Sequence, residues 1–467
     1  MPTEAADGAG EVGGERPGLA FRLRHVLWLI ALTVLQHGIV GPSAHFVRLS
    51  FFAQGHGGAD CERAPDSEPC RRAAADLALY EGVSHFATAS LAWYTALALG
   101  AYSDEVGRRP LFRAKAVLSL VPLAALAFHV LAGGTLWVFL VAFPIFEALD
   151  INGVFLAYMS DVVKEPLARS EAFGVLCGCL LLSCAVVLPF AGMLSAKVTV
   201  LISMAAAGVK LLFLYTHFPE TAPLAAPAAG PAGPLAVAAA ASALFVRSGF
   251  ILRLAIVLAS SGFAAAGLGT VLPLYLTAYM GVTKEAGTRL VAVSGASVFA
   301  ALAVALKRLV DSLGEVGALK VCLAAAAAYP ALCARCSETW QVFALTALLA
   351  GPMFLQFPVI SAIKANLVSE DEQGLLQGAL ASLRVVAVAV SQLFFGWLYR
   401  TATAGGTAPR QAAAQLPLLL AAALAGLALA VACFLPKMPP PPAQLEASPE
   451  AEALGRPEAG LAAGGGR

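Results

Sequence analysis

Two carboxylates interrupt a long apolar stretch of this sequence, in the segment FPIFEALDING. Glu147 and Asp150 are three residues apart, so on a helix they lie on one face. Carboxyl groups that are close together at low dielectric resist ionising together, so at least one of them is expected to hold a proton. Ionisable groups at membrane depth cost about 2.5–3.5 kcal/mol each on insertion scales, which makes them functional candidates. This pair is therefore suited to binding and releasing protons.

Other polar groups stand inside apolar stretches of the chain. Arg384 is the best available counter-ion for the two carboxylates, because it lies well inside its own stretch. The remaining groups expected near a central cavity are Gln36, His37, Asn152, Gln356 and Gln392. Two structural alternatives stay open. In the first, Glu147, Asp150 and Arg384 form an ion-pair network whose role is to hold packed helices together. In the second, His37 has a structural role and forms a hydrogen bond with a neighbouring group.

The composition of the chain explains why these groups stand out. Of its 467 residues, 59% are hydrophobic and 13% are charged, whereas soluble domains hold about 45–50% apolar and about 25% charged residues. The apolar residues form runs long enough to cross a hydrocarbon core of about 30 Å as helices. Stretches such as LLSCAVVLPFAGML are apolar all round, whereas helices of a soluble bundle carry a polar stripe. The expected fold class is an all-α membrane protein.

Twelve transmembrane helices are predicted from these runs. Their ranges are 26–46, 77–99, 113–132, 136–160, 171–195, 198–217, 251–280, 288–306, 316–334, 339–364, 373–400 and 413–435. Positive charges occur in alternate loops between them, which places those loops in the cytoplasm, and an even number of spans then puts both termini there too. The residues that carry this pattern are Arg22, Arg24, Arg108, Arg109, Arg113, Lys115, Lys164, Arg169, Arg247, Arg253, Lys307, Arg308 and Lys320.

The two halves of the chain share landmarks in the same order. Asp104-x-x-Gly107 is echoed by Asp311-x-x-Gly314, SEAFG by GLLQG, and FPE by LPK, at nearly one offset. These echoes predict two six-helix pseudo-repeats with a substrate site between them, near the membrane midplane. The expected organisation is a disordered cytoplasmic tail at 1–21, a six-helix bundle at 22–217, a cytoplasmic linker at 218–249, a second bundle at 250–436 and a disordered cytoplasmic tail at 437–467.

The segment GAYSDEVGRRP carries a family likeness. Gly100-x-x-x-Asp104-x-x-Gly107-Arg108-Arg109 resembles the signature loop between spans two and three of the major facilitator superfamily. The resemblance implies a twelve-span carrier in which this loop is a conformational latch that bridges spans two and eleven. It also implies that spans one, four, seven and ten line a central cavity. As an alternative, the arginines only set the membrane orientation.

Two branches of that superfamily share further segments with the chain. AYMSDVVKEPLARSEAFG and SEDEQGLLQGALASLR resemble loops of the tetracycline efflux proteins and the hippocampus-abundant-transcript-like transporters, and LGAYSDEVGRRPL also resembles the proton-coupled folate transporters. The chain departs from drug/proton antiporters in two places. Their glycine-rich motif on span five is degenerate here, and their arginine on span four is replaced by FPIFEALDING. Both departures weaken an efflux assignment.

Cysteines and cofactor motifs restrict the remaining chemistry. Cys61 and Cys70 fall in a loop that the predicted topology places outside the cytoplasm, where an oxidising compartment would favour a disulfide. The pair in CARC, without a second pair or histidines, is weak evidence for metal. Because no nucleotide-binding loop and no nucleophile or acid/base constellation is recognisable, no cofactor and no enzymatic activity are expected.

These patterns together predict a secondary active transporter of a small organic solute, working by alternating access and coupled to protons. The alternative is a membrane receptor or scaffold that keeps a carrier fold without transport; the signature loop and the midplane carboxylates argue against it. The expected partners are the solute, protons and the lipid bilayer, with no nucleic acid, and the chain is expected to be a monomer. It is expected in the plasma membrane or an endomembrane.

Overall fold

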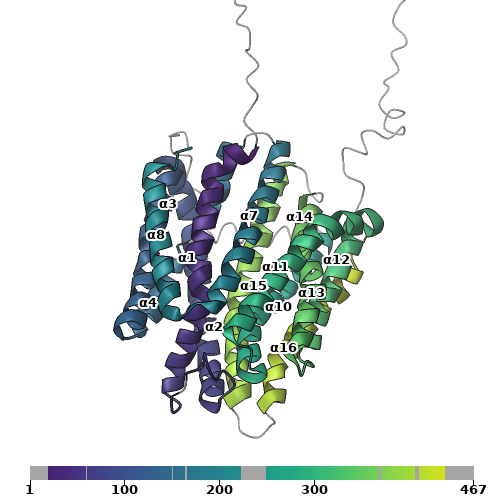
Figure 1. The fold of residues 1–467 in the computed structure, drawn as a ribbon. Coiled ribbons are helices and arrows are strands. Elements are labelled where there is room, and N and C mark those ends of the chain that lie inside the picture. The colour runs from purple at the N-terminus through teal and green to yellow at the C-terminus, as the bar shows by residue number, and fades with distance from the viewer. Residues whose placement is uncertain are drawn as a thin grey trace, which may run out of the picture. The chain divides into compact units, whose positions relative to one another are not determined.

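The computed structural model describes residues 19–58, 60–149, 151–163, 166–221, 249–365, 370–404 and 410–436, and the regular elements of these residues are all helices (Figure 1). The helices of the first half are α1 (Leu19–Gln54), α2 (Glu68–Val106), α3 (Arg108–Leu118), α4 (Leu120–Ala132), α5 (Trp137–Glu147), α6 (Asn152–Val162), α7 (Pro166–Met193) and α8 (Ala196–Thr216). Those of the second half are α10 (Gly249–Met280), α11 (Lys284–Ala300), a π-helical turn (Ala301–Ala305), α12 (Leu306–Cys333), α13 (Thr339–Phe354), α14 (Gln356–Ala365), α15 (Glu370–Ala404) and α16 (Arg410–Cys433).

The apolar runs of the sequence coincide with these helices. Each predicted range falls mainly on helix, although 113–132, 136–160 and 339–364 are each divided between two helices, and 288–306 runs over α11, the π-helical turn and the start of α12. Nine helical segments in the described part of the chain are long and apolar enough to cross a membrane. The chain is therefore a multi-pass membrane protein, and the number of twelve crossings stays a prediction.

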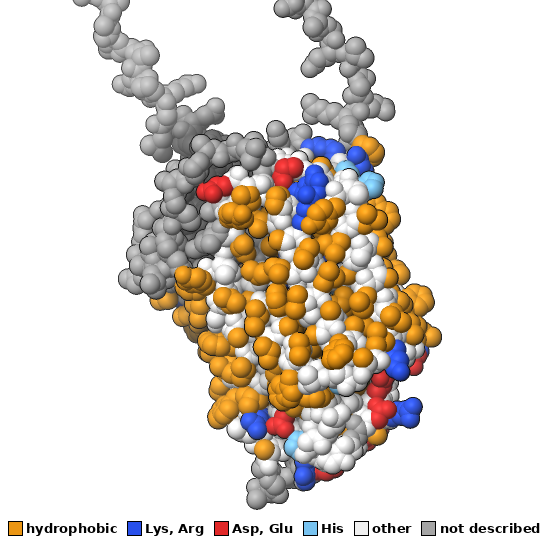
Figure 2. Space-filling view, turned by 90° about the vertical axis from the view of Figure 1, so that its left-hand side faces the viewer, with side chains coloured by type: hydrophobic (Ala, Val, Ile, Leu, Met, Phe, Trp, Pro, Cys, Tyr) orange, Lys and Arg blue, Asp and Glu red, His pale blue; other side chains and the backbone are white. Residues whose placement is uncertain are grey.

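Exposed hydrophobic side chains agree with a lipid environment. On α8, Leu201, Met204 and Leu212 are exposed although each is large and apolar. Figure 2 shows a face on which hydrophobic side chains cover the middle, while charged side chains gather toward its two ends. Water would make such a surface costly, whereas the hydrocarbon core of a bilayer accommodates it.

The chain divides into two compact units. The first comprises Met1–Phe51, Leu91–Pro231 and Lys284–Ala292, and the second comprises Phe52–Ser90, Ala232–Thr283 and Val293–Arg467. Thus α1, α2 and α11 each contribute residues to both units. Residues 222–248, which make up most of the predicted linker, lie outside the described part of the chain, as do residues 1–18 and 437–467 of the predicted tails.

An aromatic cluster holds part of the first unit together. The buried rings of Phe112 on α3, Tyr158 on α6 and Phe218, which follows α8, lie against one another. The ring centroids of Tyr158 and Phe218 are 4.8 Å apart in a stacked arrangement, and those of Phe112 and Phe218 are 5.3 Å apart, edge to face. Because Phe218 is anchored in this way, the residues that follow it are brought to the start of α3.

The core of the second unit is formed mainly by α10, α12, α15 and α16, which pack side by side. Glycines let α2 approach α15 backbone to backbone in this unit. A Cβ atom on Gly82 would lie 2.6 Å from the carbonyl oxygen of Gln392, and a Cβ atom on Gly396 would lie closer still to that of Ala78. Neither position leaves room for a side chain.

Two glycines interrupt helices in the same conformation, one in each unit. Gly107, between α2 and α3, has φ 96° and ψ 165°, and Gly314, inside α12, has φ 71° and ψ 170°. Both conformations are nearly restricted to glycine. These are the glycines of the two Asp-x-x-Gly sequences, so the sequence echo corresponds to a shared backbone geometry.

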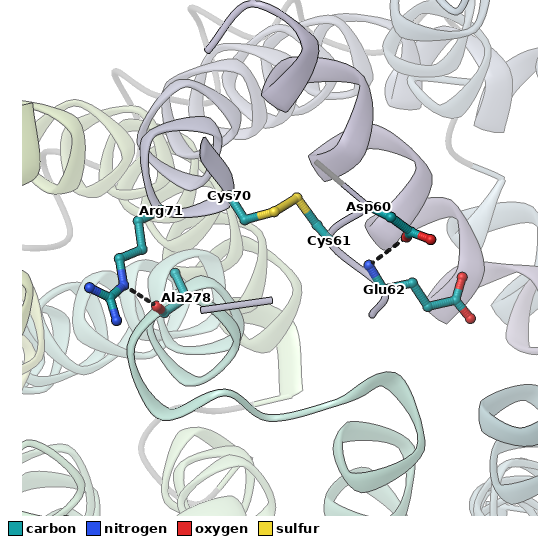
Figure 3. Close-up of a disulfide and its surroundings, with 6 residues drawn as sticks. All are labelled: Asp60, Cys61, Glu62, Cys70, Arg71 and Ala278. Atoms are coloured by element: carbon teal, nitrogen blue, oxygen red, sulfur yellow. Dashed lines mark hydrogen bonds between the residues drawn. A yellow bond between two sulfur atoms is a disulfide. The ribbon is translucent and has the colours of Figure 1, made fainter. Parts of the chain in front are cut away.

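A disulfide closes the segment between α1 and α2. Cys61 and Cys70 are joined with their Cα atoms 5.7 Å apart (Figure 3). The adjacent Arg71 donates a hydrogen bond from Nε to the carbonyl oxygen of Ala278 on α10, over 3.1 Å (Figure 3). The disulfide loop is thereby tied to α10 within the second unit.

Candidate functional site

Glu147 is the last residue of α5, and its carboxylate is paired with Lys115 of α3. The Nζ atom of Lys115 lies 3.5 Å from Oε2 of Glu147, and it also donates to the carbonyl oxygen of Phe146 over 2.8 Å. Carbonyl groups at a helix C-terminus lack partners within the helix, so this lysine satisfies the end of α5 as well as the carboxylate.

The end of α5 overturns one expectation. A single helix was predicted over 136–160, with Glu147 and Asp150 on one face of it. That prediction is wrong, because α5 ends at Glu147 and α6 begins at Asn152. Ile151, just before α6, has non-helical angles of φ −100° and ψ 16°. The helical spacing that linked the two carboxylates therefore does not apply; Asp150 and the side chain of Asn152 lie outside the described residues.

A cavity in the first unit places Glu147 and Lys115 together with two other ionisable side chains. It has a volume of about 360 Å³ and is lined by residues of α1, α3, α5, α6, α7 and α8. Among them are His37 of α1 and Lys210 of α8. The charges of Lys210, Glu147 and Lys115 act on His37, so the four side chains form one electrostatic group. A cavity of this size is within the usual range for small-molecule sites, about 300–1,000 Å³.

A second, smaller cavity adjoins the first, because both are lined by His37, Ser119 and Glu147. Its volume is about 180 Å³, and its wall includes Gln36. The side chain of Gln36 is 1% exposed, and neither its Nε2 nor its Oε1 atom has a hydrogen-bond partner in the described part of the protein. Buried amides are normally bonded, so Gln36 has unused capacity to bond a ligand or a water molecule.

The second unit holds two of the predicted site residues. The guanidinium of Arg384 lies over the ring of Phe357, 4.4 Å from its centroid. Gln356, at the start of α14, is 3% exposed, and its Oε1 atom has no partner among the described residues. Arg384 and Glu147 belong to different units, so their expected pairing stays a prediction.

The signature loop is bonded to a residue far along the chain. The backbone amides of Arg108 and Arg109 donate to the carboxylate of Glu220, over 2.8 Å and 3.0 Å. A Cβ atom on Gly107 would lie 2.6 Å from Oε2 of Glu220, so glycine is required for this close approach. An anion at a helix N-terminus is favoured by the helix dipole and by its free amides.

The side chain of Arg108 extends the same group of contacts. Its guanidinium lies 3.4 Å from Oδ2 of Asp161 on α6 and donates to the hydroxyl of Ser103 on α2. The hydroxyl of Thr221 also donates to Oδ2 of Asp161, over 3.2 Å. Side chains at the ends of α2, α3, α6 and α8 thus meet in one polar cluster.

Two further arginines bind the end of α8. Arg109 and Arg113 both donate to the carbonyl oxygen of Tyr215, over 3.2 Å and 3.0 Å. These cations satisfy carbonyls at a helix C-terminus, where positive charge is favourable. Of the predicted latch residues, Gly107, Arg108 and Arg109 therefore lie together, whereas the surroundings of Gly100 and the side chain of Asp104 are outside what the structure describes.

Sequence reasoning missed several members of these groups. Lys115 was assigned to membrane orientation alone, yet it contacts Glu147. Glu220 was noticed only as part of the repeated FPE segment, and Asp161 only within a resemblance. Lys210 was overlooked, although a lysine within the apolar stretch AAAGVKLLF is the same kind of signal that singled out Glu147.

Comparison with known proteins relates this arrangement to a transporter fold. The human organic anion transporter MFSD10 (TETRAN) superposes with a TM-score of 0.63 at 20% identity, over 89% of this chain and 100% of that one. A mutant form of the nucleoside transporter NupG gives 0.63 at 13% identity, over 90% and 100% of the two chains. A D-xylose-proton symporter gives 0.61 at 14% identity, over 91% and 99%. The chain has the major facilitator fold.

Curated relatives point to one branch of proteins with the major facilitator fold. The mouse and human proteins named Hippocampus abundant transcript 1 are each 24% identical over 325 residues, which is 66% of this chain. The match spans 63% of the length of those relatives. No protein-family model matches the chain. The resemblance to the major facilitator superfamily, and to its hippocampus-abundant-transcript-like branch, is therefore confirmed.

Proposed function

We propose that the chain is a secondary active transporter that moves a small organic solute by alternating access, with twelve spans in two six-helix repeats. The two adjoining cavities of the first unit carry this proposal. Together they combine four ionisable side chains with the amide of Gln36, which has no partner among the described residues, at a depth where such groups are costly unless they serve a function. The shared conformation of Gly107 and Gly314 supports the repeat.

The signature loop would act as a latch between conformational states. Its contacts with Glu220 and Asp161 support this role, because they tie the start of α3 to the ends of α6 and α8. In the proposal, Asp104 of α2 reaches the start of the eleventh span when the cytoplasmic side of the protein is closed. Both termini would lie on this side, in the cytoplasm, as the positive charges of the alternate loops favour.

Coupling to protons would use Glu147 and Asp150. The pair of Glu147 with Lys115 supports this, because protonation of the carboxylate would remove the attraction that holds the lysine at the end of α5. A proton would thereby change both the charge of the cavity and the contacts of one of its helices. The solutes named for the structural neighbours, organic anions, nucleosides and D-xylose, indicate the range to be tested.

Reconstitution tests the proposal. The purified full chain is inserted into liposomes with an imposed pH gradient, and proton movement is followed while solutes of each class are added. Solute-dependent proton flux is expected in the wild type and should be lost in Glu147→Gln and in Asp150→Asn. Glu105→Gln is the control, since Glu105 is exposed at the end of α2.

Each outcome has a distinct meaning. If solute uptake persisted after both carboxylates were replaced, the chain would be a carrier that is not coupled to protons through Glu147 and Asp150. If folded protein moved none of the solutes, the transport proposal would fail, and a receptor with a carrier fold would be favoured.

A further inference from the structure

The charges of the described residues on the wall of the larger cavity are not balanced. Its described lining residues include two lysines, Lys115 and Lys210, but a single carboxylate, that of Glu147. Lys115 is the lysine that pairs with it, and Lys115 also uses its Nζ atom on the carbonyl of Phe146. Among the described lining residues one positive charge is therefore left over, and it belongs to Lys210.

Lys210 lies in the middle of α8 and is 5% exposed. Its ammonium group has neither a hydrogen bond nor an ion pair within 4.0 Å in the part of the chain that the structure describes, although the charge of Glu147 acts on it from a greater distance. A buried ammonium without a close partner is costly, and an anion that entered the cavity would offset that cost. The lining of the cavity thus favours a negatively charged ligand.

Apolar side chains form much of the remaining wall. Leu29 and Val34 of α1, Phe155 of α6, Leu180 of α7 and Leu214 of α8 all line the larger cavity. A small inorganic anion would leave these side chains facing unfilled space or water. An organic anion with an apolar body would bury that body against them while its charge met the lysine.

The smaller cavity adds a second, independent indication of a ligand. The buried amide of Gln36 has both its donor and its acceptor unused among the described residues, as noted above. Arg48 also lines this cavity and donates from Nε to the carbonyl of Ala44 over 3.3 Å, so the wall here is cationic as well. An amide that can both donate and accept suits a neutral polar substituent on the ligand.

We infer that the two adjoining cavities together bind an amphipathic organic monoanion, with its carboxylate on Lys210 and its apolar body on the apolar wall of the larger cavity, and with a polar substituent at Gln36 in the smaller cavity. Lys210, rather than Lys115, sets the preference for an anion, because the charge of Lys115 is already matched by Glu147. The inference rests on the proposed function in taking these two adjoining cavities as the solute site, and it specifies the chemical class of the solute.

Three matched ligands test the inference by binding alone. 4-Phenylbutyrate, 4-phenylbutanamide and 4-phenylbutylamine share one apolar body and differ in charge. Each is titrated into the purified full chain in detergent, and binding is followed by the rise in the thermal unfolding midpoint and by intrinsic fluorescence. The carboxylate should bind at least about thirtyfold more tightly than the amide, because removing one member of a buried charge pair weakens binding by this much or more.

Variants then assign the preference to one side chain. Lys210→Gln should bind the carboxylate and the amide about equally, whereas Lys210→Arg, which keeps the charge, should retain the preference. Lys197→Gln is the matched control, since Lys197 lies on the same helix but is exposed. If Lys210→Gln does not fold, the ratio of the three ligands in the wild type and in Lys210→Arg remains decisive.

The inference is overturned by equal binding of carboxylate and amide, by preference for the amine, by binding of none of the three, or by an unchanged preference in Lys210→Gln. Failure of the proposed function is a separate result, because binding in detergent needs no transport. A protein that binds the anion but does not move it in liposomes keeps this inference and loses the function. A protein that moves only neutral solutes keeps the function and loses the inference.

Discussion

The carboxylate of Glu220 accepts a hydrogen bond from the backbone amide of Arg108 over 2.8 Å, although the two residues are 112 positions apart. Glu220 follows α8, whereas Arg108 opens α3. The first turn of α3 is thus capped by a residue that lies beyond α8 in the sequence. The buried ring of Phe218 stacks on Tyr158, and because Phe218 is two residues before Glu220, this contact positions Glu220.

Replacing Glu220 should weaken the signature loop. In Glu220→Ala, two backbone amides at the start of α3 lose their acceptor, and we expect a loss of about 1–2 kcal/mol in the free energy of unfolding, as for other helix caps. The thermal unfolding midpoint in detergent measures this effect. Glu105→Ala, at an exposed position on α2, should leave the midpoint unchanged. Equal midpoints for the two variants would show that the cap does not stabilise the loop.

Alanine at Gly107 should cost more than alanine at Gly314. Both glycines have positive φ, so both substitutions force an unfavourable backbone, at about 1–3 kcal/mol. At Gly107 the new Cβ atom would also lie 2.6 Å from the Glu220 carboxylate, whereas at Gly314 nothing lies within 4 Å. The double variant Gly107→Ala, Glu220→Ala should therefore lose less than the sum of the single variants. Strict additivity in the unfolding midpoints would contradict the close approach.

The apolar runs of the sequence predict where helices occur but not where they are interrupted. The run over 136–160 looks continuous, and Pro144, the residue in it that most disfavours helix, lies inside α5 without ending it. The helix ends three residues later, where Lys115 takes up the carbonyl of Phe146. That contact comes from another helix, so no local pattern reveals it.

The sequence likewise predicts individual residues of the candidate site but not the contacts between them. The cost of a charge in an apolar run identifies Glu147 from the sequence, and it identifies Lys210 equally well. It does not say which charges meet. Lys115 stands close to the arginines of the signature loop and therefore looks like an orientation signal. α3 nevertheless packs on α6, and its Lys115 reaches the end of α5 and Glu147. Pairing across helices is a property of tertiary packing and is absent from spacing.

Removing the disulfide should destabilise the loop that it closes. Because Cys61 and Cys70 are separated by 9 positions, loss of the bond should cost about 2–3 kcal/mol on a chain-entropy estimate. The double variant Cys61→Ser, Cys70→Ser should lower the unfolding midpoint, and a reducing agent should lower that of the wild type to the same value. Cys177→Ser, which changes an exposed free cysteine, should respond to the reductant like the wild type. A reductant effect that persists in the double variant would assign the stabilisation elsewhere.

Side chains should not be tolerated where α2 meets α15. Alanine at Gly82 or Gly396 would place a methyl group within 2.6 Å of a backbone carbonyl oxygen, so the helices must separate. We expect either variant to lower the unfolding midpoint, since overpacking costs about 1–3 kcal/mol. Gly269→Ala on α10 is the control, because nothing lies within 4 Å of its Cβ position. If Gly82→Ala and Gly396→Ala had the same unfolding midpoint as this control, the close contact between α2 and α15 would not be needed for stability.

Lys115 should stabilise the protein through two contacts, its ion pair with the Glu147 carboxylate and its hydrogen bond to the carbonyl of Phe146. In Lys115→Met, Glu147 loses its ion pair and the end of α5 loses a hydrogen bond donor, so the unfolding midpoint should fall, by an amount equivalent to about 2–4 kcal/mol. Adding Glu147→Gln removes the unpaired negative charge, so the double variant should be more stable than Lys115→Met. The recovery should be partial, because the carbonyl of Phe146 remains without the lysine. If the double variant regained the wild-type unfolding midpoint, Lys115 would act only by balancing the charge of Glu147. If its midpoint equalled that of Lys115→Met, the ion pair with Glu147 would not contribute to stability. Partial recovery would mean that Lys115 is held at the end of α5 by the backbone as well, which leaves Lys210, among the described residues that line the larger cavity, as the lysine available to a ligand.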